Sequence, residues 1–289
     1  MEVQTKNQIE YQKITVPTGR KVNYVHQGEG NAVVMVHGLA ASLHDWDDLL
    51  PEVAAAGYAG YALDLLGHGE SEKPEHTREY SVENAYADLS AWIDSLAISF
   101  PMTLIGHSLG GGLSMLYAYR NPERVKALVL VNPFYSMGQL PLILQGMFKH
   151  QLINTTLIDR TPYRVFRFFV DMTSFSGYIG NRETHVLPEH IRYQTALDYK
   201  RASSGIYNIP RTLHPIDLSL PRITQPTLLL WGGRDQTLSP DSFPTLAEKL
   251  PNLKKTHKFP ICGHVPHQCH PNNLNPIVLN FLQSASAMM

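Results

Sequence analysis

Short, unbroken apolar runs recur along this chain, and each is followed within two residues by glycine, aspartate or asparagine. The first occupies residues 32–36 and leads into His37 and Gly38. Later runs occupy residues 61–63, 102–105, 127–131 and 227–231, and a shorter strand-like segment occupies 255–259. An apolar run of this length is typical of a β-strand that is buried on both faces, as in a parallel sheet covered by helices.

Segments with helical character separate these runs. They occupy residues 81–96, 109–119, 241–250 and 273–284, and Ser81 is a suitable N-cap for the first of them. Strands that alternate with helices at this spacing predict a mostly parallel sheet with right-handed crossovers. The N-terminal part predicts a β-hairpin instead, with strands at 14–16 and 21–25 joined by a turn-forming Pro-Thr-Gly-Arg segment.

Residues 133–221 interrupt this alternation. The segment contains no clear buried strand, but residues 163–172 and 188–201 have helical character. A structureless loop of this length is unusual in a compact domain, so we expect a helical insertion. Its place in the chain would put it over the carboxyl ends of the strands, where open α/β sheets bind ligands. We therefore expect a core domain of residues 1–132 and 222–289 and a helical lid of residues 133–221.

Composition excludes several classes of protein. The 289 residues carry a net charge of −1, which gives no support for a nucleic-acid partner. The polar N-terminus lacks the apolar region of a secretory signal, and no stretch approaches the roughly 18 apolar residues of a membrane span. We expect a cytoplasmic protein that acts on a small molecule. Cys262 and Cys269 allow at most one disulfide, and nothing in the sequence indicates an oligomeric state.

A Gly-His-Ser-Leu-Gly motif at residues 106–110 places Ser108 between a predicted strand and a predicted helix. In this setting the serine occupies a sharp, strained turn that exposes its hydroxyl as a nucleophile. Glycine-rich turns between strand and helix also bind phosphate in other folds. The chain lacks both the Gly-Lys-Ser/Thr of a P-loop and the glycine spacing of a dinucleotide site, so we favour the nucleophile.

A serine hydroxyl needs a histidine base, which an acidic side chain orients. Asp235 follows the apolar run at 227–231, and His264 follows the strand-like segment at 255–259. Both should reach the edge of the sheet where Ser108 projects. Asp64 is the other candidate acid, but its early position favours a role in holding the loop at 67–71. The residue after the run at 127–131 is Asn132, and the lack of a carboxylate there also favours Asp235.

Five motifs in this order resemble the α/β-hydrolase fold family over nearly the whole chain apart from the insertion. They are His37-Gly38, the Asp-Leu-Leu-Gly-His-Gly-Glu-Ser segment at 64–71, the serine motif, Gly-Gly-Arg-Asp at 232–235 and Gly-His at 263–264.

The resemblance implies a mostly parallel central sheet flanked by helices, with a helical lid insertion. It also implies that Ser108 is the nucleophile, His264 the general base and then acid, and Asp235 the orienting carboxylate. The backbone N–H groups of Leu39 and Leu109 would form the oxyanion hole. No cofactor is implied.

The histidines and cysteines near the C-terminus suggest a metal site only weakly. His264, His267 and His270 with the two cysteines match none of the common zinc spacings, and catalysis already accounts for His264. We therefore expect no metal. His107 is expected to pack beside the serine turn and to point away from Ser108, and His37 to act as a hydrogen-bonding support.

The insertion is rich in aromatic residues: Phe134, Tyr135, Phe148, Phe166, Phe168, Phe169, Phe175 and Tyr178. We expect most of them to pack the insertion onto the core and a minority to line an apolar pocket. The sequence does not identify which residues between Pro133 and Pro221 bind the substrate.

Ser108 stands where epoxide hydrolases and haloalkane dehalogenases of this fold carry an aspartate, which disfavours both activities. The sequence therefore predicts a carboxylesterase or small lipase that acts through an acyl-enzyme. A carbon–carbon bond hydrolase of a diketone-like product, an acyltransferase and a cofactor-independent perhydrolase would use the same triad. A non-catalytic binding protein of this fold would be expected to lack one of the three residues.

Overall fold

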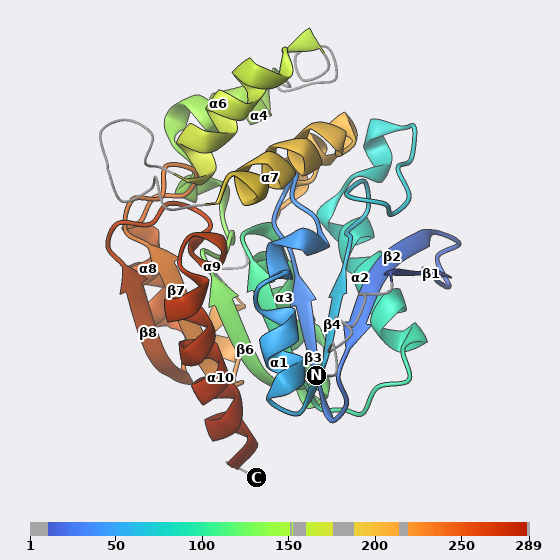
Figure 1. Ribbon diagram of the computed structural model, residues 1–289, viewed down its shortest axis with the longest axis vertical. Helices are drawn as coiled ribbons and strands as arrows, with labels where there is room; N and C mark the ends of the chain where they lie inside the picture. Colours follow the sequence, from blue (N-terminus) through green and yellow to red (C-terminus); the bar gives the residue numbers. More distant parts are fainter. Residues whose placement is uncertain (1–10, 151, 153–159, 176–187, 214–218, 288–289) are drawn as a thin grey trace, which may run out of the picture.

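The computed structural model describes residues 11–150, 152, 160–175, 188–213 and 219–287. An eight-stranded sheet runs through its centre (Figure 1). Its strands are β1 (Tyr11–Thr15), β2 (Lys21–Gln27), β3 (Asn31–Val36), β4 (Tyr58–Leu63), β5 (Met102–His107), β6 (Val125–Val131), β7 (Thr227–Gly232) and β8 (Leu253–Phe259). The predicted α/β-hydrolase fold with a mostly parallel sheet is confirmed.

The strand order explains why distant motifs meet at one edge. The order is β1-β2-β4-β3-β5-β6-β7-β8, with antiparallel pairing at β1/β2 and β2/β4 and parallel pairing elsewhere. Val36, at the end of β3, lies beside Leu63 of β4 and beside Gly106 of β5. The residues that follow these three strands are therefore neighbours, because parallel strands bring their carboxyl ends to the same edge.

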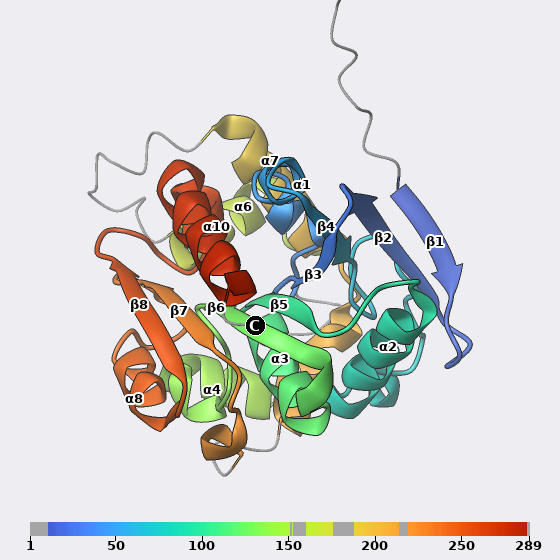
Figure 2. The ribbon, with the colours of Figure 1, turned by 90° about the horizontal axis from the view of Figure 1, so that it is seen from below.

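Helices cover both faces of the sheet (Figure 2). They are α1 (Leu50–Ala55), α2 (Val82–Ser95), α3 (Leu109–Arg120), α4 (Leu142–Lys149), α6 (Tyr163–Ser174), α7 (Glu189–Arg201), α8 (Ser242–Lys249), α9 (Pro266–Cys269) and α10 (Pro271–Ala287). Helices α1 and α10 pack on one face, and α2, α3 and α8 on the other.

The two faces form separate hydrophobic cores because successive strand side chains point to opposite sides. Val34 belongs to the core that contains Trp92 of α2 and Leu113 of α3, whereas its neighbour Met35 belongs to the core that contains Val278 of α10. Val34 and Met35 are both fully buried, and burial of one such side chain stabilises the fold by about 1.5–3 kcal/mol. This double burial is the reason for the unbroken apolar runs in the sequence.

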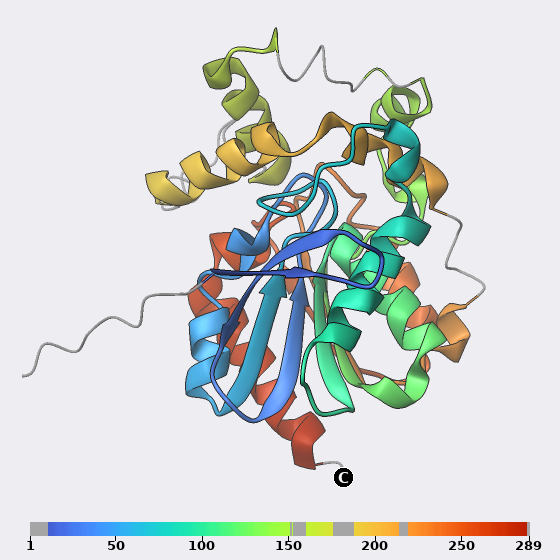
Figure 3. The same ribbon diagram turned by 90° about the vertical axis from the view of Figure 1, so that its right-hand side faces the viewer.

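Helices α4, α6 and α7, here called the cap helices, lie beyond the carboxyl ends of the strands (Figures 1 and 3). Helices α6 and α7 correspond to the two segments of the insertion that were expected to be helical. They are joined by Arg192 of α7, whose Nε donates to Asp171 Oδ1 of α6 at 3.0 Å. Helix α4 was not predicted, and its Leu142 and Ile143 are 83% and 78% exposed. None of the helices among the described residues has the length and apolar character needed to cross a bilayer.

Candidate active site

Ser108 sits at the junction of β5 and α3 with an unusual backbone conformation. Its φ is 49° and its ψ is −117°, and it occupies the N-cap position of α3. A non-glycine residue with positive φ is strained, and strain of this kind persists only where the surrounding structure enforces it. The main-chain carbonyl of Ser108 accepts hydrogen bonds from Gly112 N and Phe134 N, at 3.2 and 2.8 Å. The strand-to-helix turn therefore has the sharp geometry that the sequence motif predicts.

Close main-chain packing explains the glycine at position 110. A Cβ atom there would lie 2.1 Å from the Val36 carbonyl oxygen and 2.6 Å from that of His37. We expect Gly110→Ala to lower the free energy of unfolding by about 2 kcal/mol or more, because backbone atoms must shift to admit the methyl group. Denaturant unfolding followed by circular dichroism measures the change.

Gly146→Ala provides the matched control, because a Cβ at this position of α4 meets nothing within 4 Å. This control should leave stability unchanged or raise it by up to about 1 kcal/mol. Equal stability of the two variants would contradict the packing argument.

The structure brings Ser108, His264 and Asp235 into one hydrogen-bonded chain. The Ser108 hydroxyl lies 2.9 Å from His264 Nε2, and His264 Nδ1 lies 2.7 Å from Asp235 Oδ2. A carboxylate can only accept, so the Nδ1–H of His264 donates to Asp235, and Nε2 is left to accept from the serine hydroxyl. All three side chains are buried. This is the geometry that a serine nucleophile, its base and an orienting acid require.

Asp235 accepts hydrogen bonds on both carboxylate oxygens. The backbone N–H groups of Thr237 and Leu238 donate to Oδ1 at 2.8 and 2.9 Å, and Asn132 Nδ2 donates to Oδ2 at 2.7 Å. Asn132 itself has a positive φ of 43° and is fully buried. In the sequence, Asn132 is visible only as a position without a carboxylate, and its contact with Asp235 was not predicted. Asn132 helps to fix the orientation of the acid.

The main chain of His264 is held on both sides. Its backbone N–H donates to the Ser174 carbonyl at the end of α6, at 2.9 Å, and its carbonyl accepts from His107 Nε2 at 2.9 Å. The His107 side chain thus lies against the backbone of His264 and makes no hydrogen bond with Ser108. Burial lowers the pKa of the His107 imidazole to about 4, with a further contribution from the neighbouring His267.

Two buried histidines support the turn that follows β3. His37 Nε2 accepts from Leu65 N at 2.9 Å, and its Nδ1 donates to the Gly38 carbonyl at 2.7 Å. Burial lowers the pKa of His37, which agrees with this neutral, singly protonated form. A hydrogen-bonding supporting role for His37 was expected from the sequence.

The second histidine, His68, was not singled out by the sequence. Its Nε2 accepts from Ala40 N at 3.0 Å, and its Nδ1 donates to the Leu66 carbonyl at 2.8 Å. Burial holds the pKa of His68 well below its usual range. The N–H of Ala40 is therefore occupied, whereas the N–H of Leu39 has no hydrogen-bond partner among the described residues. The N–H of Leu109 lies in the first turn of α3, where helical N–H groups have no intrahelical partner.

Asp64 lies in a separate hydrogen-bond network. Its oxygens accept from Leu43 N at 2.8 Å, from Glu70 N at 2.9 Å and from Asn23 Nδ2 at 2.7 Å. These contacts anchor the loop after β4 and the turn before α1. Asp64 makes no hydrogen bond with His264, so its position agrees with a loop-holding role.

A cavity of about 460 Å³ opens onto Ser108 and His264. It is lined mainly by apolar side chains from the cap helices and the core, among them Leu39, Leu140, Leu144, Met147, Val170 and Leu238. Four of the aromatic residues noted in the sequence also line it: Phe134, Phe148, Phe166 and Phe169. The described part of the lining contains no lysine, arginine, aspartate or glutamate.

Residues with uncharged hydroxyl groups make up most of the polar residues that line this cavity. They include Tyr199, Tyr207 and Thr237. Burial raises the pKa of both tyrosines, so their hydroxyl groups stay protonated. The other aromatic residues noted in the sequence lie elsewhere: Phe175 and Tyr135 are buried, Phe168 is 47% exposed, and Tyr178 lies outside the described residues.

The C-terminal histidines and cysteines do not come together as one group. Cys262 and Cys269 are free thiols. His267 instead lies beside Asp45 and His107, which come from distant parts of the sequence. Sequence spacing could not reveal this cluster, because three separate segments contribute one residue each.

The chain belongs to the alpha/beta hydrolase fold family, whose pattern matches residues 31–271. Together with the buried serine, histidine and aspartate, this membership identifies the protein as a hydrolase.

Three proteins with different named activities are similar to this chain in sequence. It is 30% identical to the cis-3-alkyl-4-alkyloxetan-2-one decarboxylase of Shewanella oneidensis over 267 residues, which cover 85% of this chain and 80% of that protein. Identity to the 2-hydroxymuconate semialdehyde hydrolase of a Pseudomonas species is 26%, covering 98% and 97% of the two chains. Identity to the bifunctional epoxide hydrolase 2 of Mus musculus is 23%, covering 96% of this chain but only 56% of that protein.

Solved structures show the same architecture. A putative lipase from Acinetobacter baumannii superimposes with a TM-score of 0.80 and 21% identity, covering 97% of this chain and 93% of the other. At this identity the likeness demonstrates a shared fold.

Proposed function

We propose that the protein hydrolyses carboxylic esters of small or medium-sized apolar substrates through an acyl-enzyme on Ser108. The observation that carries this proposal is the hydrogen-bonded chain from Ser108 through His264 to Asp235, which opens into a largely apolar cavity. We further propose that residues 133–221 act as a lid whose side chains select the substrate.

In the proposed mechanism, Ser108 Oγ attacks the ester carbonyl while His264 Nε2 takes up the hydroxyl proton. Asp235 holds the imidazole in the required tautomer and stabilises the imidazolium that forms. The N–H groups of Leu39 and Leu109 stabilise the negative charge on the carbonyl oxygen, where one such donor contributes about 3–4 kcal/mol. His264 then protonates the departing alcohol. A water molecule, activated by the same imidazole, releases the acid and restores Ser108.

The lining of the cavity supports an uncharged, apolar substrate. An acid or amine buried there would lose its hydration without gaining an ion-pair partner from the described residues, which is costly. The Shewanella relative is named for a dialkyl oxetan-2-one, which is a cyclic ester with apolar chains. That name is in keeping with ester recognition in an apolar site.

The epoxide hydrolase relatives do not change this proposal, because enzymes of that kind carry an aspartate nucleophile where this chain has Ser108. The Pseudomonas relative favours a second candidate, a carbon–carbon bond hydrolase, because it matches almost the full length of both chains. That reaction would use the same three residues. A substrate that carries a carboxylate would meet no cationic side chain in the described lining, which favours the ester hydrolase.

A panel of p-nitrophenyl esters from acetate to long-chain acyl groups tests the proposal. We expect turnover of the short and medium-chain esters and covalent labelling by a fluorophosphonate. If no ester is hydrolysed and no label is bound, the ester hydrolase proposal is wrong. Turnover of a vinylogous diketone with poor ester activity would support the carbon–carbon bond hydrolase instead.

Two substitutions on helix α6 link the chain-length profile to this cavity. Val170 is buried and lines the cavity, whereas Val165 is 46% exposed on the same helix and does not. Val170→Phe should therefore reduce turnover of the longer esters at least tenfold relative to acetate. Val165→Phe should leave the profile unchanged. The same profile in both variants would show that the acyl chain binds elsewhere.

A further inference from the structure

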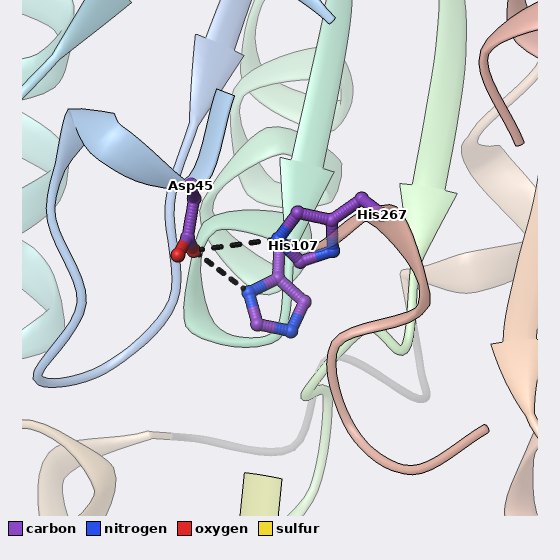
Figure 4. Close-up of side chains that lie close together, drawn as sticks. All are labelled: Asp45, His107 and His267. Carbon is purple, nitrogen blue, oxygen red and sulfur yellow. Dashed lines mark hydrogen bonds and ion pairs between the residues drawn. The ribbon is translucent and has the colours of Figure 1, made fainter. Parts of the chain in front are cut away.

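Asp45, His107 and His267 form a buried cluster next to the candidate triad (Figure 4). Asp45 belongs to the single helical turn Leu43–Trp46, His107 ends β5, and His267 belongs to α9. Their exposed fractions are 6%, 1% and 2%. Both imidazole rings turn a nitrogen toward the Asp45 carboxylate (Figure 4).

The three potential ligand atoms lie close enough together to bind one small cation. Asp45 Oδ2 is 3.2 Å from His107 Nδ1 and 3.7 Å from His267 Nε2. One ligand atom from each residue lies within 4.8 Å of the other two. Zinc binds imidazole nitrogen and carboxylate oxygen at about 2.0–2.2 Å, and such bond lengths require ligand atoms at separations of this order.

The hydrogen bonds of His107 leave a lone pair directed at a carboxylate. Its Nε2 lies 2.9 Å from the His264 carbonyl, which can only accept, so this nitrogen carries the hydrogen. In the neutral imidazole, Nδ1 is then an acceptor, and it faces Asp45 Oδ2 across 3.2 Å. Two acceptors at this distance repel each other unless a positive charge lies between them.

His267 supplies a second, independent observation. Both of its ring nitrogens are buried, and neither has a hydrogen-bond partner among the residues that the structure describes. The ring stacks on Trp46 with 5.0 Å between centroids, so packing fixes its orientation. A buried imidazole without hydrogen bonds is costly, and coordination of a cation by Nε2 would remove part of that cost.

His107 and Asp45 are each held by a hydrogen bond of the kind that orients metal ligands in known sites. There, a coordinating histidine donates its other ring N–H to a carbonyl or carboxylate, and a coordinating carboxylate is itself hydrogen-bonded. His107 donates to the His264 carbonyl in this way, and Gln268 Nε2 donates to Asp45 Oδ1 at 2.9 Å.

We propose that Asp45, His107 and His267 bind a divalent transition-metal ion, with Zn²⁺ as the best match. Two imidazoles and one carboxylate suit this borderline-soft ion, and its charge compensates the buried carboxylate. The ion would tie together the turn before α1, the end of β5 and helix α9. The ion would hold these segments beside the candidate triad, because His107 directly precedes Ser108 and its Nε2 donates to the His264 carbonyl.

Metal analysis of the wild-type protein provides the primary test. The chain is produced without a histidine tag in minimal medium supplemented with Zn²⁺ or Co²⁺, and it is then passed over a chelating resin. We expect close to one ion per chain by mass spectrometry and the visible absorption of protein-bound Co²⁺ in the cobalt sample. Removal of the ion should lower Tm by about 5 °C or more, because an ion that binds only the folded state stabilises it.

Two histidine variants locate the ion. His267→Gln should lose the retained metal and the cobalt spectrum, whereas His270→Gln, in the same segment but outside the cluster, should keep both. A wild-type protein that retains no metal and shows no change in Tm would overturn the proposal, and a proton would then separate His107 from Asp45. Retention of the full metal content by His267→Gln would overturn it as well. The wild-type result decides the matter even if a variant fails to fold.

Discussion

Ser108→Ala is expected to lower kcat for ester hydrolysis by about a million-fold, the effect of losing the nucleophile in enzymes that use such a triad. The substitution removes the Oγ atom that would form the acyl-enzyme. Alanine has to adopt the same positive φ as Ser108, so the strain in the turn, and with it the fold, should be retained. Hydrolysis of a p-nitrophenyl ester and the mass increase on fluorophosphonate labelling measure the loss.

Ser114→Ala is the matched control for this experiment. Ser114 is buried in α3, and its hydroxyl makes no hydrogen bond within the described residues. Its substitution should leave both readouts close to wild type. If Ser108→Ala retained activity or labelling, another residue would have to be the nucleophile.

Asp235→Asn is expected to lower kcat by about 10⁴-fold with little change in Tm. If the amide NH₂ group took the place of Oδ2, it would face the N–H donors of His264 and Asn132. If the amide oxygen took that place, the NH₂ group would face the backbone N–H groups of Thr237 and Leu238 instead. Either arrangement destabilises the imidazolium that forms during the reaction. Steady-state kinetics on the best ester of the panel, together with thermal unfolding, separates this loss from misfolding.

Two further aspartate variants show which carboxylate orients the base. Asp241→Asn, at an exposed position just before α8, should behave as wild type. Asp64→Asn should lower Tm clearly and kcat only slightly, because Asp64 accepts hydrogen bonds from the loops that it holds. A large loss of kcat in Asp64→Asn, with Asp235→Asn near wild type, would reverse the assignment.

The sequence predicted the parts of this protein that depend on local pattern. Strands buried on both faces have apolar residues at most positions, so most of these strands could be located directly. The turn at Ser108 was also predictable, because its glycines are required by the backbone contacts around them. Motif order then indicated which aspartate and which histidine lie near the serine.

Features that depend on contacts between distant segments could not be read from the sequence. Asn132 was visible only as a residue without a carboxylate, because its bond to Asp235 joins positions 103 residues apart. The cluster of Asp45, His107 and His267 arises from strand order, which brings three segments to one edge. Helix α4 was missed because Leu142 and Ile143 are exposed and obscure the pattern of a buried face.

The insertion of residues 133–221 contacts the candidate triad through main-chain atoms of Phe134 and Ser174. Phe134 N donates to the Ser108 carbonyl, and the Ser174 carbonyl accepts from His264 N. Bonds of this kind do not depend on side-chain identity, so residues that face the cavity can be exchanged without removing them. The serine, its base and their spacing can therefore stay constant while the pocket diverges. This separation gives the chain a route to new substrates through substitutions in the insertion alone.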